Sequence, residues 1–171
     1  MSLTLSRIGL SVIIPLLLIP VAFATTPAAR PAPLPASGSW TDQNLVSLTV
    51  STGPSGITIE QATITGVITG SVSGTYSTTS TVFVTSPALA YYYAVDYCTC
   101  TIGGNGPYLI TFNEFGSLTL SPQGFYVLAS SASAGATGSP RYSISIQLAG
   151  TLNPLTDLSA GGYSGTYTYQ S

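Results

Sequence analysis

The chain has 171 residues, of which only 5% are charged: three arginines stand against five aspartates and glutamates, and there is no histidine. Nucleic-acid binding requires several cations to neutralise phosphates, so this composition excludes that class of partner, and it excludes a polybasic membrane-surface role for the same reason. The 44% hydrophobic content excludes a disordered chain, because disorder requires low hydrophobicity together with high net charge.

The first 24 residues have the features of a cleavable export signal. Arg7 supplies a positive charge, an apolar run extends from Ile8 to about Val21, and Ala22-Phe23-Ala24 has the small-x-small pattern that signal peptidase accepts. The run is short for a membrane span and is interrupted by prolines. We therefore predict that residues 1–24 are removed, that the mature protein is secreted to the extracellular side, and that no transmembrane helix remains.

Residues 25–39 are predicted to form a Pro/Ala-rich linker or arm, because alternating prolines favour extended polyproline geometry. From residue 40 to 171, apolar and polar residues alternate with a period of two, which predicts a single β-domain. One stretch alternates without a break from Ala62 to Tyr76, and glycines on its apolar face indicate where a long strand bends. The small-residue stretch from Ser130 to Pro140 is expected to form a loop.

Shorter alternating segments continue to the C-terminus and are separated by turns that contain glycine and proline. The clearest runs from Arg141 to Ala149, where Tyr142, Ile144 and Ile146 are predicted to face inward. No segment shows helical periodicity over three turns. The fold class is therefore all-β, and we expect an antiparallel barrel of about eight strands, with a β-sandwich as the alternative.

Two segments resemble the allene-oxide-cyclase-like barrel proteins, which include dirigent proteins and small secreted members of unknown function. The first is Thr65-Gly66-Val67-Ile68-Thr69-Gly70-Ser71-Val72-Ser73-Gly74-Thr75-Tyr76, which is similar to their early strands. The second runs from Gly150 to Tyr167, where a Gly-rich turn and a Leu-containing loop precede a Gly-x-Tyr-x-Gly-Thr strand. The resemblance implies an eight-stranded antiparallel barrel with an apolar lumen, and it implies no particular activity because a fold does not fix a function.

The C-terminal strand is also similar to the last strand of pilus-type and spore-coat-type sandwich subunits. Those subunits assemble by donating a strand to the sheet edge of a neighbour. In that case the Pro/Ala-rich arm would be the free segment available for exchange.

The absence of histidine excludes Ser-His-Asp and Cys-His nucleophile systems and zinc sites with histidine ligands. We therefore predict no catalytic residue, no metal site and no cofactor. Glu60 shares a strand face with Ala62 and Ile64, and a buried carboxylate there would have a raised pKa and could act as an acid or base. The favoured interpretation is a solvated Glu60 near the end of its strand, and the same applies to Asp96 and Glu114.

Cys98 and Cys100 form a Cys-Thr-Cys pair, and in an exported protein a disulfide is the default expectation. Residues two apart in a flat strand have Cα atoms ~6.5–7 Å apart, at the limit of what a disulfide allows. A bond between these two residues therefore predicts a bulge or turn at Thr99. A bond between two molecules and two free thiols remain the alternatives.

The eleven tyrosines and Trp40 could line a ligand pocket or form a stacking surface for sugars. In an all-β domain such aromatic residues more often form cross-strand packing pairs. Three consecutive aromatic residues, Tyr91, Tyr92 and Tyr93, cannot all face one side of a strand. We expect at least one of them to be exposed and suited to contact with a partner.

The leading functional hypothesis is a non-enzymatic exported β-domain that binds a cell-surface partner or self-associates at the cell exterior, since low net charge lets subunits approach one another. The alternative is a small-molecule-binding or cyclase/dirigent-like barrel with an apolar pocket of ~300–1,000 Å³. A lumen filled by its isoleucines would argue against that alternative. An outer-membrane barrel fits the size but ranks last, because so few charges leave no obvious polar lumen. Pairing between the first and last strands favours the small-molecule barrel, whereas a bare sheet edge favours strand-donating assembly.

Overall fold

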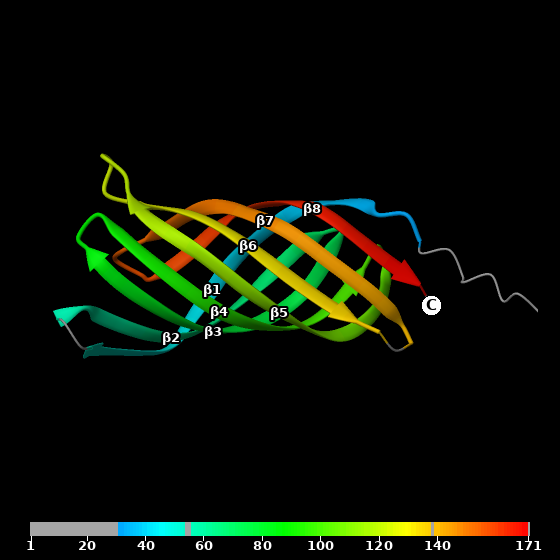
Figure 1. The fold of residues 1–171 in the computed structure, drawn as a ribbon, viewed down its shortest axis with the longest axis horizontal. Helices are drawn as coiled ribbons and strands as arrows, with labels where there is room; N and C mark the ends of the chain where they lie inside the picture. Colours follow the sequence, from blue (N-terminus) through cyan, green and yellow to red (C-terminus); the bar gives the residue numbers. More distant parts are fainter. Residues whose placement is uncertain (1–30, 54–55, 138, 171) are drawn as a thin grey trace, which may run out of the picture. The chain divides into compact units, whose positions relative to one another are not determined.

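The computed structural model describes residues 31–53, 56–137 and 139–170, which form a closed antiparallel barrel of eight strands (Figure 1). Each strand pairs with the next in the chain, and β1 also pairs with β8. The all-β barrel prediction is confirmed, and the sandwich alternative is wrong. The strands are β1 (Leu34–Thr52), β2 (Thr58–Gly70), β3 (Val72–Ser86), β4 (Leu89–Ile102), β5 (Asn105–Leu120), β6 (Tyr126–Ala136), β7 (Arg141–Asn153) and β8 (Leu158–Gln170).

The predicted export signal, residues 1–24, lies outside the described residues, as do residues 25–30 of the predicted arm. Within the described ranges, no helix has the length and apolarity needed to cross a membrane.

The barrel begins earlier than the sequence pattern indicates, so the arm prediction is wrong for residues 34–39. β1 starts at Leu34, and its first four residues pair with β8 alone, because pairing with β2 begins at Gly38. Pro35 has no N–H to donate, and a proline is tolerated where a strand has a neighbour on one side only. Ala36 is buried in the lumen, which anchors this segment in the barrel.

The unbroken alternation from Ala62 to Tyr76 proves to be a hairpin and not a single bent strand. β2 ends at Gly70, β3 begins at Val72, and Ile68 pairs with Gly74 across the turn. Gly70 has a φ of 109°, a backbone conformation that favours glycine. A tight turn of this kind returns the chain with the same inside-outside alternation, so the periodicity of the sequence does not reveal it.

The expected loop from Ser130 to Pro140 is also wrong, because β6 continues to Ala136. From Ser130 onward its inward residues are small, and each pairs with a large inward residue of β7: Ser130 with Leu148, Ala132 with Ile146, and Ala134 with Ile144. Large side chains of β7 therefore lie opposite small side chains of β6, which avoids clashes in the barrel interior. The lack of large apolar residues from Ser130 to Ala136 reflects this complementarity.

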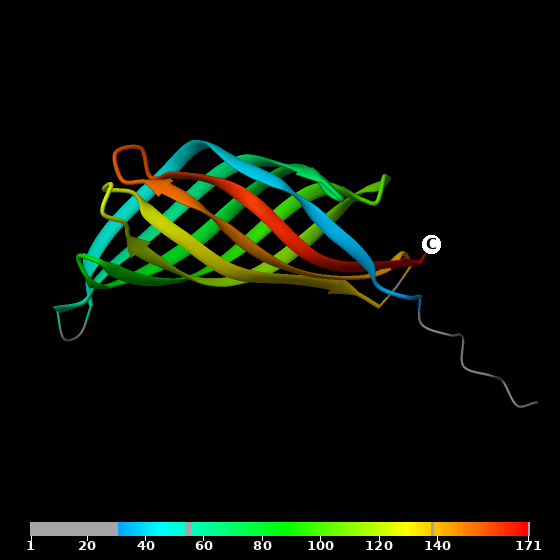
Figure 2. The same cartoon turned by 90° about the horizontal axis from the view of Figure 1, so that it is seen from above.

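The two ends of the barrel differ in packing: the end that carries the β2–β3 and β4–β5 turns is filled by buried side chains, and we call the opposite end the turn end. The packed end contains the most deeply buried side chains, with at most 1% exposure: Val72, Cys98, Cys100, Ile102, Ile110 and Ile144. The β1–β2, β3–β4, β5–β6 and β7–β8 turns gather at the opposite end (Figures 1 and 2). The lumen is therefore closed at the packed end.

Most outward residues are serine and threonine, but one sector of the wall is aromatic. On the outer face of β3, β4 and β5 lie the exposed side chains of Phe83, Tyr91, Tyr93, Tyr97, Leu109 and Phe115. Tyr93 and Phe115 are directly opposite in the β4–β5 ladder, with ring centroids 4.9 Å apart. The exterior is therefore apolar or hydroxylated with little charge.

Candidate functional site

The middle of the lumen encloses an inner chamber of about 110 Å³, to which all eight strands contribute side chains. An outer chamber of about 260 Å³ lies toward the turn end and is bordered by Leu48, Pro154 and Asp157. The two chambers share the side chains of Ile64, Ser80, Val82, Leu118 and Leu152. They therefore form one lumen in two sections.

The isoleucine filling that would argue against a small-molecule barrel is found only in part. Ile64, Ile68 and Ile146 form wall of the inner chamber, whereas Ile144 belongs to the packed end. Neither chamber alone reaches the ~300 Å³ typical of sites for drug-sized ligands. A ligand that fits must be small or must extend through both sections.

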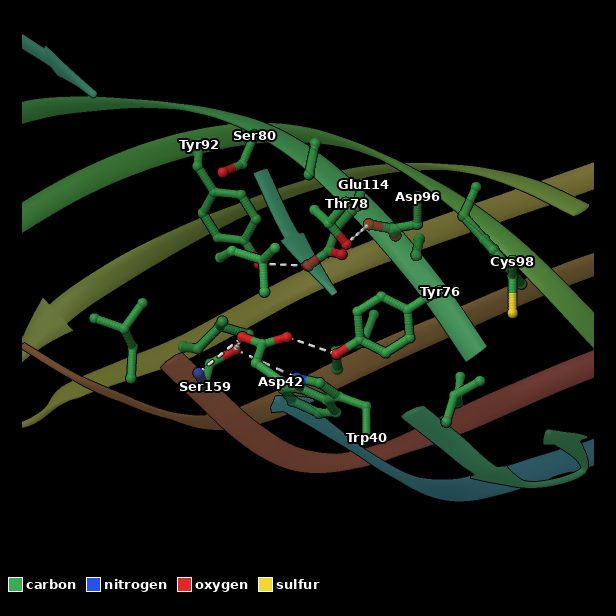
Figure 3. A pocket seen from close by; sticks show the side chains of 18 of the residues that line it. Trp40, Asp42, Tyr76, Thr78, Ser80, Tyr92, Asp96, Cys98, Glu114 and Ser159 are labelled. Atoms are coloured by element: carbon green, nitrogen blue, oxygen red, sulfur yellow. Dashed lines mark hydrogen bonds between the residues drawn. The ribbon is translucent and has the colours of Figure 1, made fainter. Parts of the chain in front are cut away.

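Three carboxylates from three different strands project into the inner chamber (Figure 3). They are Asp42 on β1, Asp96 on β4 and Glu114 on β5. Each carboxylate accepts hydrogen bonds from hydroxyl groups of other strands. The three carboxylates differ in whether one or both of their oxygens accept such a bond.

Asp42 has hydrogen-bond donors on both oxygens. The Tyr76 hydroxyl donates to Oδ1 at 2.5 Å, and Ser159 donates to Oδ2 from its backbone N–H at 2.8 Å and from its hydroxyl at 2.6 Å. The indole N–H of Trp40 in turn donates to the Ser159 hydroxyl at 3.4 Å. These contacts tie β1 to β3 and β8, so Asp42 serves to fix the wall of the lumen.

Glu114 is 8% exposed and receives both of its hydrogen bonds on one oxygen. The hydroxyl groups of Tyr92 and Ser130 donate to Oε1, the latter at 2.6 Å. Oε2 receives neither of these two hydroxyl groups, and the side chain lines the inner chamber beside Asp96. A carboxylate oxygen that faces a cavity can accept hydrogen bonds from a ligand.

Asp96 borders Glu114 and has an unusually high pKa. Burial is the largest cause and the negative charge of Glu114 the second, and together they raise the pKa of Asp96 to about 7, although the 2.6 Å hydrogen bond from Thr78 opposes the shift. A hydrogen bond with Glu114 also stabilises the protonated form. The negative charge of Glu114 disfavours a second negative charge beside it, so Asp96 keeps its proton up to about pH 7.

The tyrosines that hold the carboxylates remain protonated donors. Burial, followed by the charge of Asp42, raises the pKa of Tyr76, and burial followed by the charge of Glu114 raises the pKa of Tyr92. Each hydroxyl therefore stays protonated near neutral pH and can donate to its carboxylate.

Two glycines make room for these tyrosine rings. A Cβ on Gly66 would lie 2.4 Å from the Tyr76 hydroxyl oxygen, and a Cβ on Gly116 would lie 2.6 Å from Tyr92 Cε1. Such contacts are closer than packed atoms tolerate, so an aromatic ring folded over a glycine backbone requires that glycine. Glycines in the neighbouring strands thereby position the donors of the acidic cluster.

The predicted site residues are divided between the inside and the outside of the barrel. Tyr92 points into the inner chamber, while Tyr91 and Tyr93 are on the outer face, as expected for three consecutive aromatic residues of which at least one is exposed. Glu60, the third residue of β2, lines the outer chamber and is half-buried. It lies apart from the Asp96–Glu114 pair.

Asp96 and Glu114 are not the solvated side chains that the sequence interpretation favoured. Both lie inside the barrel at positions that alternate with buried residues, Ala94 and Cys98 around Asp96 and Phe112 before Glu114. The sequence reasoning missed the roles of Asp42, Thr78, Ser130 and Ser159 altogether. Asp42 follows Trp40 by two residues, and that spacing was the only available signal of an inward position.

Cys98 and Cys100 lie on the closed side of the inner chamber and are joined as a disulfide, with Cα atoms 5.3 Å apart. No bulge occurs at Thr99, because both cysteines and Thr99 keep consecutive partners on β3. A register irregularity follows between Cys100 and Ile102, where β4 pairs with β5. The predicted bulge is therefore displaced toward the end of the strand.

Within the described ranges, no group of three or more Cys, Asp and Glu side chains lies close enough together to hold a metal ion. No family model, no curated protein and no solved structure matches this chain. The fold and the lumen define the class as a closed antiparallel β-barrel with a carboxylate-lined interior.

Proposed function

We propose that this protein is an exported barrel that binds a small organic molecule in its lumen. The observation that carries the proposal is a cavity, enclosed by all eight strands, in which polar groups converge on an otherwise apolar wall. Binding sites for small molecules have this composition, with a few placed polar groups among many apolar ones. The ligand enters at the turn end, because the opposite end is packed with buried side chains.

The proposal includes export of the protein and a relationship to the allene-oxide-cyclase-like barrel proteins. The features of residues 1–24 support secretion, and the closed eight-stranded barrel agrees with what the resemblance to allene-oxide-cyclase-like proteins implies. The resemblance implies an apolar lumen, whereas the lumen of this barrel is lined in part by carboxylates. The polar outward faces of β7 and β8 do not fit an outer-membrane barrel, whose outward band is apolar.

Strand-donating assembly is the weaker hypothesis. It requires a free sheet edge, and β1 is paired with both β2 and β8. The aromatic outer face of β3–β5 remains a surface on which copies could associate. Size-exclusion chromatography over a wide concentration range tests that contact, and a species that stays monomeric throughout would exclude it.

Binding of a neutral apolar dye, N-phenylnaphthylamine, tests the proposed function. Trp40 is the sole tryptophan and lines the inner chamber, so bound dye should quench its fluorescence with a one-to-one stoichiometry. Ala132→Phe fills the lumen and should abolish the quenching, whereas Ala129→Phe adds the same ring on the exposed face of the same strand and should not. Equal quenching in both variants would refute a lumenal site.

A second candidate is general acid–base catalysis on the bound molecule, such as a cyclisation or isomerisation. The pKa of about 7 at Asp96, next to a second carboxylate, favours it, because an acid–base catalyst works best with a pKa near the ambient pH. Incubation of the protein with candidate substrates should then give turnover that Asp96→Asn abolishes while dye binding persists.

A further inference from the structure

Negative charge in this protein is confined to the lumen. The sequence contains five acidic residues, and all of them line one of the two chambers: Asp42, Asp96 and Glu114 the inner one, Glu60 and Asp157 the outer one. The one cationic side chain among the described residues, Arg141, is exposed at the first position of β7, at the packed end. No protein cation therefore compensates these carboxylates within the described part of the chain.

Taking a carboxylate out of water is costly unless a cation or several donors replace the lost hydration. Donors satisfy Asp42 on both oxygens. Glu114 is more than nine-tenths buried and has both hydroxyl donors on Oε1, and Asp96 has its hydroxyl donor, Thr78, on Oδ1. Beyond these hydroxyl groups, the two carboxyl groups have only each other as partners, so their remaining oxygens can accept hydrogen bonds from a ligand in the inner chamber.

We propose that the lumen binds a primary or secondary organic ammonium ion, whose N–H groups donate hydrogen bonds to the adjacent carboxyl groups of Asp96 and Glu114. The apolar part of this ligand lies in the outer chamber, against Val82, Leu118 and Leu152. This inference rests on the proposed function, since it names the ligand class of the same lumen.

An organic cation fits the lumen better than a metal ion does. The described residues place no three metal-ligating side chains together, whereas an ammonium group needs only acceptors for its N–H donors. The ligand must also bring apolar surface, because the outer chamber is bordered mostly by aliphatic side chains. Glu60 and Asp157 at the entrance extend the negative potential outward, which attracts cations and disfavours anions.

Binding of an ammonium ion is coupled to proton release. Asp96 is faced by Glu114 and Asp42 and by the hydroxyl groups of Tyr76 and Tyr92, and none of these groups is cationic. A bound cation favours the ionised form of Asp96, so Asp96 releases its proton when the ligand binds. The affinity should therefore increase as the pH rises from about 6 to about 8, around the pKa of about 7.

Titration of the purified protein with n-hexylamine, n-hexanol and hexanoate tests the proposal, followed by calorimetry and Trp40 fluorescence. At pH above 7 the amine should bind at least about tenfold tighter than the alcohol, and hexanoate should not bind. Glu114→Gln should weaken amine binding by about tenfold or more while alcohol binding changes little. Glu60→Gln, the matched control, removes the same charge from the outer chamber and should have a much smaller effect.

Calorimetry of the unaltered protein in two buffers of different ionisation enthalpy gives the number of protons released, and it depends on no variant. Hexylamine should release up to about one proton near neutral pH, and hexanol none. If hexylamine bound without releasing a proton, the placement of its ammonium group at Asp96 and Glu114 would be overturned. Equal affinity for amine and alcohol would overturn the ammonium inference but leave lumenal binding intact. Failure of the amine, the alcohol and the dye to bind would refute the proposed function itself.

Discussion

Asp96 and Glu114 occupy diagonal positions on the inner face of the β4–β5 ladder. Asp96 is opposite Phe112, and Glu114 is opposite Ala94, two residues further toward the turn end. Diagonal neighbours in an antiparallel pair are within reach of each other through long side chains. This relationship places the negative charge of Glu114 beside Asp96 and helps to raise the pKa of Asp96, which has consequences for stability as well as for binding.

The stability of the protein should fall as the pH rises from about 4 to about 7. Folding raises the pKa of Asp96 from 3.8 to about 7, so the native state binds a proton that the unfolded state releases in this interval. The stabilisation is fully present below pH 3.8 and is lost as the pH passes the native pKa. The expected loss is on the order of 3 kcal/mol, measured by urea denaturation across the interval.

Asp96→Asn serves as the control for this effect. The amide does not titrate, so its unfolding free energy should vary much less over the same pH interval. An unchanged pH dependence in the variant would assign the effect to another group.

Tyr92→Phe should destabilise the barrel by about 1–3 kcal/mol, because it leaves Glu114 buried with Ser130 as its remaining donor. Tyr93→Phe removes a hydroxyl from the adjacent, outward-facing residue and should change stability by less than about 0.5 kcal/mol. Chemical denaturation of both variants measures the difference. Equal effects would mean that the hydrogen bond to Glu114 contributes nothing to folding.

Gly66→Ala should be strongly destabilising, by roughly 2–4 kcal/mol, because the added methyl group would overlap the Tyr76 hydroxyl and lie 2.5 Å from the carbonyl oxygen of Thr41. Gly135→Ala is the control, since its Cβ would meet only one backbone oxygen, at 3.4 Å. Thermal unfolding of the two variants compares them. A Gly66→Ala protein as stable as the control would show that Tyr76 can move without cost.

The cysteine pair should resist alkylation in the native protein. Cys98 and Cys100 are joined and have at most 1% exposure, so iodoacetamide should label them only after denaturation and reduction. Because the closed loop is very short, replacing both residues with alanine should cost only about 1–2 kcal/mol through chain entropy. Labelling of the denatured but unreduced protein, followed by mass spectrometry, would reveal free thiols if the bond were absent.

The barrel could be predicted from the sequence because apolar and polar residues alternate strictly over most of the chain, and few other folds are compatible with that pattern. The exact strands could not, for physical reasons that particular residues illustrate. The turn at Gly70 and Ser71 preserves the parity of the alternation, because an odd number of residues separates the paired positions Ile68 and Gly74. The glycine at position 70 was the available signal of a turn. Residues 130–136 lack large apolar side chains because β7 supplies the volume opposite them.

The acidic site was harder to predict than the fold. Its carboxylates come from β1, β4 and β5, and their convergence depends on barrel closure and strand register, which no local pattern contains. The alternation of Val95 and Tyr97 also suggests a buried face, whereas Tyr97 is exposed and Asp96 points inward. A carboxylate inside a small barrel contradicts the usual expectation for charged residues, so the sequence interpretation favoured solvent.

Placing every acidic side chain in the lumen or at its entrance also changes how copies of this protein should interact in solution. Repulsion between copies in solution arises from charges that face the lumen, so solubility depends mainly on the hydration of serine and threonine hydroxyl groups and responds little to salt. Migration in an electric field, by contrast, depends on the total charge. Electrophoretic mobility near neutral pH should therefore report the ionisation and occupancy of the lumen, without a label and without access to the interior.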